Sequence, residues 1–321
     1  MNKTPKISVV LPVYNGIKYL EESVMSVLNQ DTEDYEFLIC DDCSTDGSYE
    51  YLQKINSDKI KLFRNERNLG LFPTLNRLIK AAKSPLIHLW AQDDLMMSNC
   101  LSETIKFHQK FTDINFSFSR MYMIDENGKV IKKLFEIEDK VISPWGHAKS
   151  SILYGSIAGN IANVTLVKSA VEKVGYFNES MKYAGDFEMW CKLSKDKPVG
   201  MSAGYLIKLR VHSGQLSKNL EASYYKLKEN IEVYKCFLSH FKGKQFKIAI
   251  RALKWKIYPQ YFNQYLVIKR KGKKDLAKKY KKGLKSYGNL LALFLRWLII
   301  RILRLLKLEQ KFYQKFIISK F

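Results

Sequence analysis

Short apolar segments alternate with amphipathic ones through the first 110 residues, and the two patterns predict two kinds of element. Four compact apolar runs, bounded by proline or other turn-forming residues, are typical of strands. Between them, apolar side chains recur every three or four positions, as on one face of a helix. The strands are expected at residues 7–12, 37–40, 60–63 and 86–91, and the helices at 19–28, 49–55 and 72–82. This alternation predicts an α/β fold built on a doubly wound, mostly parallel sheet.

The regular alternation ends after a further helix near residues 100–110. An extended stretch at 115–124 is followed by turn-forming residues 125–129, which predict a hairpin into residues 130–135. Three glycines interrupt residues 136–163, where we expect loops and an irregular helix. From about residue 224 the pattern is helical to the end of the chain.

The run 86–91 is followed by two adjacent carboxylates, Asp93 and Asp94, and the strand 37–40 is followed by Asp41 and Asp42. Ligands of parallel sheets collect at the carboxyl ends of the strands, so both pairs are expected at one edge. Adjacent carboxylates raise each other's pKa unless a cation or hydrogen-bond donors offset their charge, which suggests Mg²⁺ or Mn²⁺. A surface turn or a helix cap is the alternative, since aspartate is common in both.

The 321 residues carry a formal charge of +23, and this charge is concentrated near the C-terminus. Residues 240–321 contain 23 Lys and Arg against two acids, whereas residues 1–239 contain 31 Lys and Arg against 29 acids. A nearly neutral body with a strongly basic tail predicts that the two parts meet different partners.

The last predicted helix, residues 290–308, is amphipathic. Its four charged residues project within about 140° of arc at 100° per residue, and Leu, Ile, Phe and Trp occupy the rest. The expected apolar stripe consists of Leu290, Leu291, Leu293, Phe294, Trp297, Leu298, Ile300 and Leu305. The longest uncharged stretch there has about ten residues, which is too short to span a bilayer. This helix therefore predicts peripheral attachment to an anionic membrane, with packing on the body or on a second subunit as the alternative.

The five cysteines form an odd, scattered set, which favours a reducing compartment and predicts no disulfide. Cys40 and Cys43 have C-x-x-C spacing, but no second pair follows, so a metal or redox role is disfavoured. The first residues contain no apolar signal region, and we expect a cytoplasmic protein.

Several ordered blocks resemble the motifs of family-2 glycosyltransferases over roughly residues 6–218. The blocks are Val10-Leu11-Pro12-Val13-Tyr14-Asn15, Asp41 to Ser48, Arg67-Asn68-Leu69-Gly70 with Asn76, Gln92-Asp93-Asp94, Gly185 to Leu193, and Arg210-Val211-His212 with Ser217. Each block alone is weak evidence for this family, whereas the whole set, in this order, is specific to it. The departures are Cys43 after Asp42 and a metal motif that reads Gln-Asp-Asp.

The resemblance implies a GT-A fold that transfers a sugar, with inversion, from a UDP- or dTDP-type donor to a hydroxyl of a glycan or lipid-linked glycan. It implies a glycosyltransferase domain at residues 1–222, divided near residue 110 into a nucleotide-sugar half and an acceptor half, followed by a membrane-associating helical region at 223–321. An acceptor pocket is expected within residues 136–163. We expect the enzyme on the inner face of the plasma membrane, in cell-surface polysaccharide synthesis; the sequence predicts no oligomeric state.

The resemblance also assigns roles to individual residues. The residues expected to bind the sugar-nucleotide donor are Pro12, Tyr14, Asn15, Asp41, Asp42, Asn68, Gly70 and Asp93. The residues expected to bind the metal are Asp94, Asp93 and His212. Asp42 is expected to accept a hydrogen bond from the nucleotide base, with Asp41 as the alternative. Asp186 is the expected general base, although it could instead cap the helix that follows it.

Other polar residues are expected to have structural roles. Asp46 is favoured as the cap of the helix that starts near residue 48. His88, His108, His147 and His240 are expected to be structural, and His212 could contact a phosphate instead of a metal.

Two other function classes compete with this reading. The basic tail suggests a nucleic-acid-binding protein, but a nucleic-acid surface does not need so wide an apolar stripe, so we expect no nucleic-acid partner. A catalytically idle sugar-nucleotide or glycan-binding module is disfavoured because the metal and base carboxylates are all present.

Overall fold

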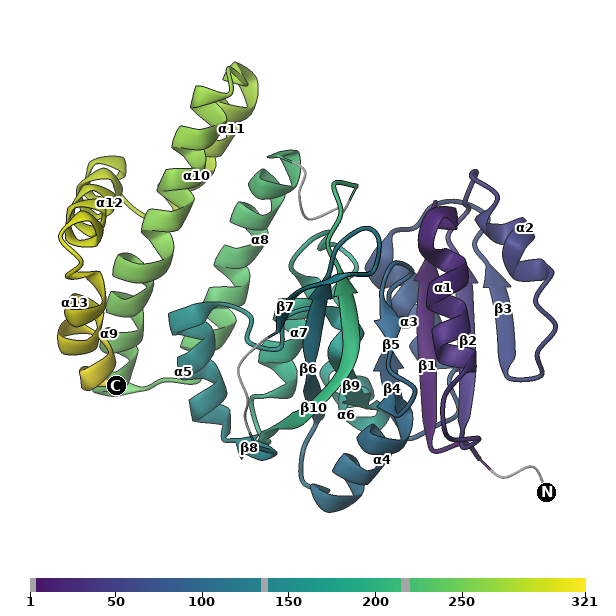
Figure 1. The fold of residues 1–321 in the computed structure, drawn as a ribbon. Coiled ribbons are helices and arrows are strands. Elements are labelled where there is room, and N and C mark those ends of the chain that lie inside the picture. The colour runs from purple at the N-terminus through teal and green to yellow at the C-terminus, as the bar shows by residue number, and fades with distance from the viewer. Residues whose placement is uncertain (1–3, 134–137, 215–219) are drawn as a thin grey trace. The chain divides into compact units, whose positions relative to one another are not determined.

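The computed structural model describes residues 4–133, 138–214 and 220–321, and it contains one large mixed sheet (Figure 1). The strand order is β3 (Ile60–Arg64), β2 (Tyr35–Asp41), β1 (Ile7–Val13), β4 (Leu86–Leu89), β9 (Val164–Val167), β6 (Phe116–Ile124), β10 (Val199–Arg210) and β5 (Leu95–Met96). Neighbours from β3 to β4 are parallel, as are β6 and β10, while β9 and β5 run antiparallel to their neighbours. The predicted α/β class and mostly parallel sheet are confirmed.

Helices cover both faces of the parallel part of the sheet. Their bounds are α1 (Ile17–Leu28), α2 (Ser48–Gln53), α3 (Leu71–Ala81) and α4 (Cys100–Lys110). Leu20 and Val24 of α1 share one core cluster with Val9 of β1. The neighbouring residue Val10 points to the opposite face, because side chains alternate along a strand, and α3 packs against β1 and β2. Each fully buried aliphatic side chain of this kind contributes roughly 1.5–3 kcal/mol to folding.

The second half of the sheet departs from the predicted pattern. β10 is the longest described strand, yet its register against β6 shifts around residues 202–206, so its sequence does not alternate cleanly. A hairpin does join β6 to β7 (Val130–Lys133), and β8 (Lys140–Ile142) pairs with β10. Residues 134 and 135 of the predicted second hairpin strand lie outside the described residues. The irregular helix expected within 136–163 is a regular one, α5 (Pro144–Tyr154), because Gly146 falls in its first turn.

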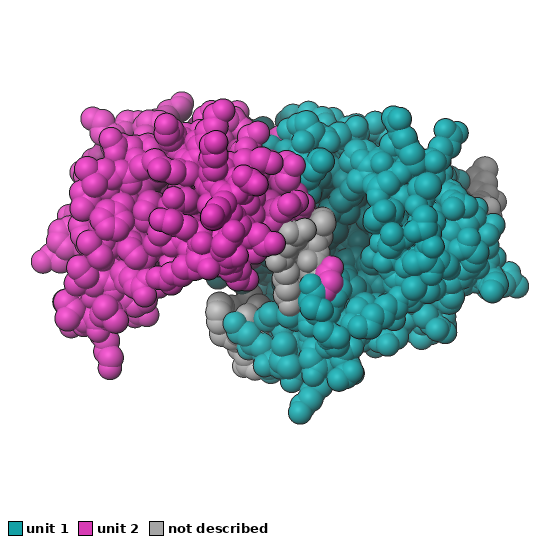
Figure 2. Space-filling view, turned by 90° about the horizontal axis from the view of Figure 1, so that it is seen from above, with its two compact units in different colours: residues 1–143, 158–182, 196–213 teal, residues 144–157, 183–195, 214–321 magenta. Residues whose placement is uncertain are grey.

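The chain divides into two compact units, shown in different colours in Figure 2. Unit 1 contains residues 1–143, 158–182 and 196–213, and therefore the sheet; unit 2 contains 144–157, 183–195 and 214–321. The predicted boundary near residue 222 differs from this division, because α5 and α7 (Gly185–Leu193) pack with the C-terminal helices.

Unit 2 is helical, as predicted for the tail. Its C-terminal helices are α8 (Leu220–Leu238), α9 (Gly243–Ala252), α10 (Tyr258–Arg270), α11 (Lys274–Leu284), α12 (Leu290–Leu305) and α13 (Glu309–Phe316), with a π-helical turn at Leu253–Ile257. Leu227, Phe262, Tyr280 and Leu293 belong to its core. Within the described residues, every helix is too short or too polar to cross a bilayer.

A disulfide joins Cys191 of α7 to Cys236 of α8, so the prediction of no disulfide is wrong. The two residues are 45 positions apart, and their Cα atoms lie 6.4 Å from each other. Only the packing of α7 on α8 brings them together, which residue spacing cannot reveal. The other three cysteines are thiols, and the C-x-x-C pair remains unlinked.

Candidate active site

The loops after β1 and β4 meet at the point where the sheet changes its direction of winding. β2 and β3 lie on one side of β1 and β4 on the other, and ligands of doubly wound sheets bind at such a point. The Gln92 side chain joins the two loops. The Tyr14 N–H donates to Gln92 Oε1 at 2.9 Å, and Gln92 Nε2 donates to the Tyr14 carbonyl at 3.0 Å. A Cβ at Gly16 would lie 2.4 Å from the Gln92 side chain, so any larger residue there would displace the Gln92 amide from Tyr14. Tyr14 is 46% exposed and Pro12 is half-buried.

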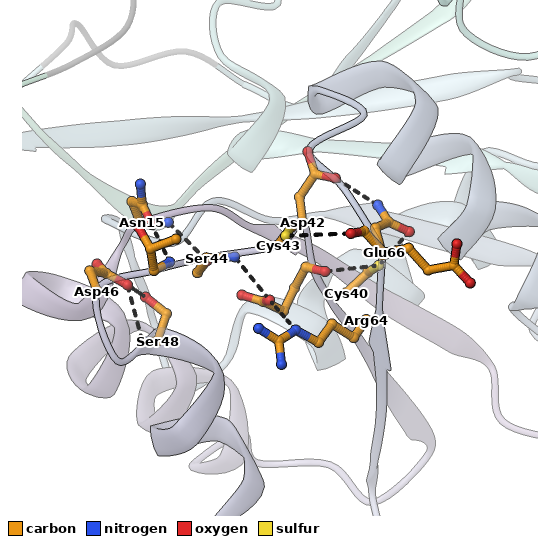
Figure 3. A network of polar contacts seen from close by, with 12 residues as sticks. Asn15, Cys40, Asp42, Cys43, Ser44, Asp46, Ser48, Arg64 and Glu66 are labelled. Atoms are coloured by element: carbon orange, nitrogen blue, oxygen red, sulfur yellow. Dashed lines mark hydrogen bonds and ion pairs between the residues drawn. The ribbon is translucent and has the colours of Figure 1, made fainter.

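A polar network fixes the loop after β1 against the loop after β2 (Figure 3). The Asn15 N–H donates to Ser44 Oγ at 3.0 Å, and Asn15 Oδ1 accepts from the Thr45 N–H at 2.9 Å. Asp46 accepts from the N–H of Ile17, at the start of α1, and from Ser48, at the start of α2. Asp46 therefore has a structural role, as predicted, although Gly47 occupies the N-cap position of α2.

The two adjacent carboxylates after β2 differ in how many partners they have. Asp42 is 3% exposed, and it accepts from Asn65 Nδ2 at 2.7 Å and from the N–H groups of Leu69 and Gly70 at 2.8 Å each. These bonds fix the loop before α3, where Gly70 has a φ of +92°. Asn68 lies in this loop and is exposed. The Asp42 carboxylate is thus already occupied by hydrogen bonds from the protein itself.

Asp41 is also buried but only partly satisfied. Its Oδ2 accepts from the Ser44 N–H at 3.1 Å and lies 3.4 Å from Arg64 Nε. Its Oδ1 has no hydrogen-bond partner among the described residues. Of the two carboxylates, Asp41 has the greater remaining capacity to accept a hydrogen bond.

Asp93 and Asp94 follow β4 and have different surroundings. Asp93 Oδ2 lies 2.9 Å from His212 Nε2, and both side chains are partly exposed. Asp94 is buried: its Oδ1 accepts from the Arg210 N–H at 2.8 Å, while Oδ2 lacks a partner within the described part of the chain. Burial, and then the nearby Asp93 charge, raise the pKa of Asp94 well above its usual value, and Arg210 lowers it in part.

Arg210 is the residue that sequence reasoning missed at this site. Its side chain is buried, and it donates to the Asp93 carbonyl at 3.0 Å, to the Glu126 carbonyl at 2.9 Å and to Glu22 Oε2 at 2.7 Å. Its guanidinium also lies over the Tyr19 ring. A buried arginine with this many bonds fixes the carboxylate loop in place. The sequence placed Arg210 in the block Arg210-Val211-His212 but gave it no role at the site.

These residues fit a hard divalent cation by their chemistry. Carboxylate oxygens are the ligands that Mg²⁺ and Mn²⁺ prefer, and imidazole is compatible with Mn²⁺. Asp94 Oδ2 is a buried acceptor that lacks a donor among the described residues, as expected of an atom that ligates a cation. The three predicted ligands do not lie as close together as the 4.8 Å cluster of Cys191, Cys236 and His240, which is the one such group found in the described residues.

Asp186 lies in unit 2, in the first turn of α7. Ala184 occupies the N-cap position of this helix, so Asp186 is not its cap. Asp186 Oδ1 accepts from the adjacent Phe187 N–H at 2.7 Å. Glu229 of α8 instead binds the chain before the helix, accepting from the N–H groups of Tyr183 and Ala184 at 2.9 and 2.8 Å.

A cavity of about 340 Å³ in unit 2 is lined in part by Asp186. The other lining residues are mostly aromatic or uncharged and polar: Tyr154, Gly155, Ser156, Tyr183, Ala184, Phe187, Lys226, Asn230, Tyr234, Ile257, Gln260 and Tyr261. Burial raises the pKa of Asp186 to about 6, although the Phe187 N–H and the Lys226 charge lower it in part. The Asp186 carboxyl therefore has a pKa close to neutral pH and lies beside a cavity that can hold a ligand.

Comparison with known proteins gives the same family as the sequence blocks. The family model described as glycosyl transferase family 2 matches residues 8–172. An uncharacterized glycosyltransferase of Methanocaldococcus jannaschii is 27% identical over 276 residues, which cover 82% of this chain and 89% of that protein. An uncharacterized glycosyltransferase of Rickettsia felis is 28% identical over 67% of this chain, and the match spans 36% of that longer protein.

The fold is also similar to that of a solved structure. S. aureus TarS residues 1–349, in complex with UDP-GlcNAc, superposes with a TM-score of 0.61. The match covers 88% of this chain and 84% of that one, at 17% sequence identity. At this identity the likeness establishes the GT-A type of fold alone.

Proposed function

Because this chain belongs to glycosyl transferase family 2, we propose that it transfers a sugar, with inversion, from a UDP- or dTDP-sugar to a hydroxyl of a glycan or lipid-linked glycan. The observation that carries this proposal is Asp186, a half-buried carboxylate with a pKa of about 6 that lines a cavity rich in tyrosine. The reaction belongs to cell-surface polysaccharide synthesis.

The donor nucleotide is proposed to bind at the loops after β1, β2 and β3. Tyr14 and Pro12 frame the base, and Asp41 accepts the imide N–H of uracil or thymine. Asp41 is preferred to Asp42 because Asp42 already accepts three hydrogen bonds from the protein. Asn15, Asn68 and Gly70 line the same loops. The UDP-GlcNAc bound by TarS, a protein of similar fold, supports a uracil nucleotide.

The leaving diphosphate is proposed to bind beside Asp93, Asp94 and His212, which would hold Mg²⁺ or Mn²⁺. When bound, such a cation neutralises the charge that develops on the diphosphate. Arg210 holds the two aspartates in position through its backbone and side chain. These contacts reduce the reorganisation needed when the donor binds.

The acceptor is proposed to occupy the cavity beside Asp186. Sugars present C–H groups to aromatic rings and hydroxyl groups to amides, and this cavity offers both in Tyr154, Tyr183, Asn230 and Gln260. Asp186 takes the proton from the attacking hydroxyl as the new bond to the anomeric carbon forms. The diphosphate leaves from the opposite face, and the configuration is inverted, as in inverting glycosidases with a sugar hydroxyl in place of water.

The C-terminal helices are proposed to attach the enzyme to the anionic inner face of the plasma membrane. In α12, Leu293 and Ile300 of the expected stripe are buried in unit 2, and Trp297 is half-buried. The alternative of packing on the body thus accounts for part of the stripe. Four residues of the expected stripe are exposed, namely Leu291, Phe294, Leu298 and Leu305. Together with Leu295, Ile299, Ile302 and Leu306 they form an exposed apolar set.

This exposed set favours a membrane over a nucleic acid as the tail's partner. At 100° per residue it spans about 140° of the helix without a charged side chain. Arg301 borders it, and the tail as a whole contains 23 Lys and Arg against two acids. Apolar burial and attraction to anionic headgroups together give stable peripheral attachment.

A direct assay tests the catalytic proposal. The full chain is incubated with UDP-GlcNAc or a dTDP-sugar, Mn²⁺ and a panel of glycan acceptors, and nucleoside diphosphate release is measured. We expect acceptor-dependent release that a chelator abolishes and that added Mn²⁺ restores. Release that persists in chelator would contradict the metal assignment, and failure to bind any sugar nucleotide would contradict the donor assignment.

A further inference from the structure

Three potential metal ligands cluster in unit 2. They are the sulfurs of Cys191 and Cys236 and the Nε2 atom of His240, and all lie within 4.8 Å of one another. Cys191 Sγ is 3.5 Å from His240 Nε2. Cys191 is fully buried and the other two residues are partly buried. The proposed transfer reaction uses none of the three.

One spacing in this cluster, from Cys191 Sγ to His240 Nε2, matches that of a tetrahedral zinc site, while the two sulfurs are bonded to each other as a disulfide. Bond lengths of about 2.3 Å to sulfur and about 2.0 Å to nitrogen place the two ligand atoms about 3.5 Å apart in a tetrahedron. The observed sulfur-to-nitrogen distance has this value. The Cα atoms of the two cysteines are 6.4 Å apart, near the wide end of the range found for disulfides. With the sulfurs reduced, this backbone separation leaves room for them to move apart around an ion.

The local sequence supports the same geometry. Cys236 lies in the last turn of α8, which ends at Leu238, and His240 follows in the turn after the helix. The chain continues in turns here, since the His240 N–H donates to the Phe237 carbonyl at 3.1 Å. The C-terminal end of a helix carries partial negative charge, which favours a cation.

We propose that, when its two sulfurs are reduced, this chain binds one Zn²⁺ through Cys191, Cys236 and His240. Thiolate and imidazole are the ligands that zinc prefers, and water completes the fourth position. The ion ties α7, which carries Asp186, to α8, which carries Glu229. The disulfide is the alternative state of the same two sulfurs, and the two states exclude each other. This proposal does not depend on the transfer reaction.

Metal analysis of the full chain tests the proposal. The protein is purified with a phosphine reductant, supplied with Zn²⁺ and desalted, and its zinc content is measured. We expect one zinc per chain in the wild type and loss of this zinc in Cys191→Ser and His240→Ala. Cys43→Ser is the matched control, because Cys43 is a thiol outside the cluster, and it should keep the zinc.

A second measurement keeps the test valid if a variant folds poorly. Co²⁺ replaces zinc in the reduced wild type, where thiolate ligands give a charge-transfer band and tetrahedral coordination gives intense visible bands. Zn²⁺ should also raise the melting temperature of the reduced wild type. Reduced protein without stoichiometric zinc, or with octahedral cobalt spectra, would overturn the proposal. A disulfide that persists in the reductant would overturn it as well.

Discussion

Asp42 and Asp46 of unit 1 are held differently from Asp186 of unit 2. In unit 1, Asp42 and Asp46 accept several backbone N–H groups, and these bonds join the loops after neighbouring strands. In unit 2, Asp186 accepts from the adjacent Phe187 N–H, and its pKa is raised by burial beside a cavity. A tightly bonded carboxylate is suited to positioning, whereas a poorly solvated one is suited to accepting a proton. The loops proposed to bind the donor are therefore fixed in structure, and the cavity proposed for the acceptor leaves room for an exchangeable ligand.

The largest effect is expected for Asp186→Asn. The amide has nearly the same volume but cannot accept a proton, so kcat should fall by about 10²–10⁴-fold, the usual contribution of a general base. Donor affinity should remain near the wild-type value, because Asp186 acts only in the chemical step. Steady-state kinetics and calorimetric titration with UDP check the two parts. Weakened donor binding with kcat preserved would instead make Asp186 a binding residue.

A paired substitution sharpens the contrast within unit 1. Asp41→Asn should weaken binding of the donor nucleotide by about 1.5–3 kcal/mol, the value of one hydrogen bond to a charged group. Asp42→Asn should mainly lower the melting temperature, because its carboxylate fixes the loop before α3. Each variant is the control for the other, and thermal melts with and without UDP measure both effects. Equal loss of stability with equal loss of binding would show that the two residues have one shared role.

The pH dependence should reflect the environment of Asp186. Its pKa of about 6 lies above the usual aspartate value, and only the ionised carboxylate can accept a proton. Turnover should therefore level off above pH 6 and fall about tenfold per unit below it. A profile of kcat against pH at saturating donor and Mn²⁺ provides the measurement. A residual rate in Asp186→Asn that keeps the same inflection would assign the titration to another group.

The parallel half of the fold could be predicted from sequence because each strand and helix there has its own periodic pattern. The common edge at which strands such as 37–40 and 86–91 end could also be predicted, because these strands run parallel in one sheet. Asp41 and Asp42 could not be told apart, because their partners Leu69 and Gly70 donate backbone N–H groups that no motif encodes.

Other features depend on tertiary packing alone. β10 was missed because its register shifts and its glycines hide the alternation of buried residues. Arg210 resembles any basic residue of a closing motif until its hydrogen bonds to Asp93, Asp94, Glu126 and Glu22 are seen. Cys191 and Cys236 lie far apart in sequence, and helix packing brings them together.

The smallest catalytic effect is expected from changes to the exposed face of α12. Leu298→Glu and Ile302→Glu place charges on this face and leave the buried residues Leu293 and Ile300 in place, so unit 2 should remain folded. Flotation of the full chain with anionic vesicles should be lost, because an acidic face neither inserts between headgroups nor is attracted to them. Transfer to a soluble acceptor should be unchanged. Deleting the whole helix is a weaker test, since it would uncover the core around Leu293.

A matched control uses the same chemistry elsewhere on the surface. Val130→Glu and Ile131→Glu change two exposed apolar residues of β7, in unit 1, by the same charge. This variant should float with anionic vesicles as the wild type does. If the α12 variant also floats normally, the helix does not attach the enzyme to membranes. If the α12 variant changes the molecular mass in solution instead, its exposed face binds a second copy of the chain.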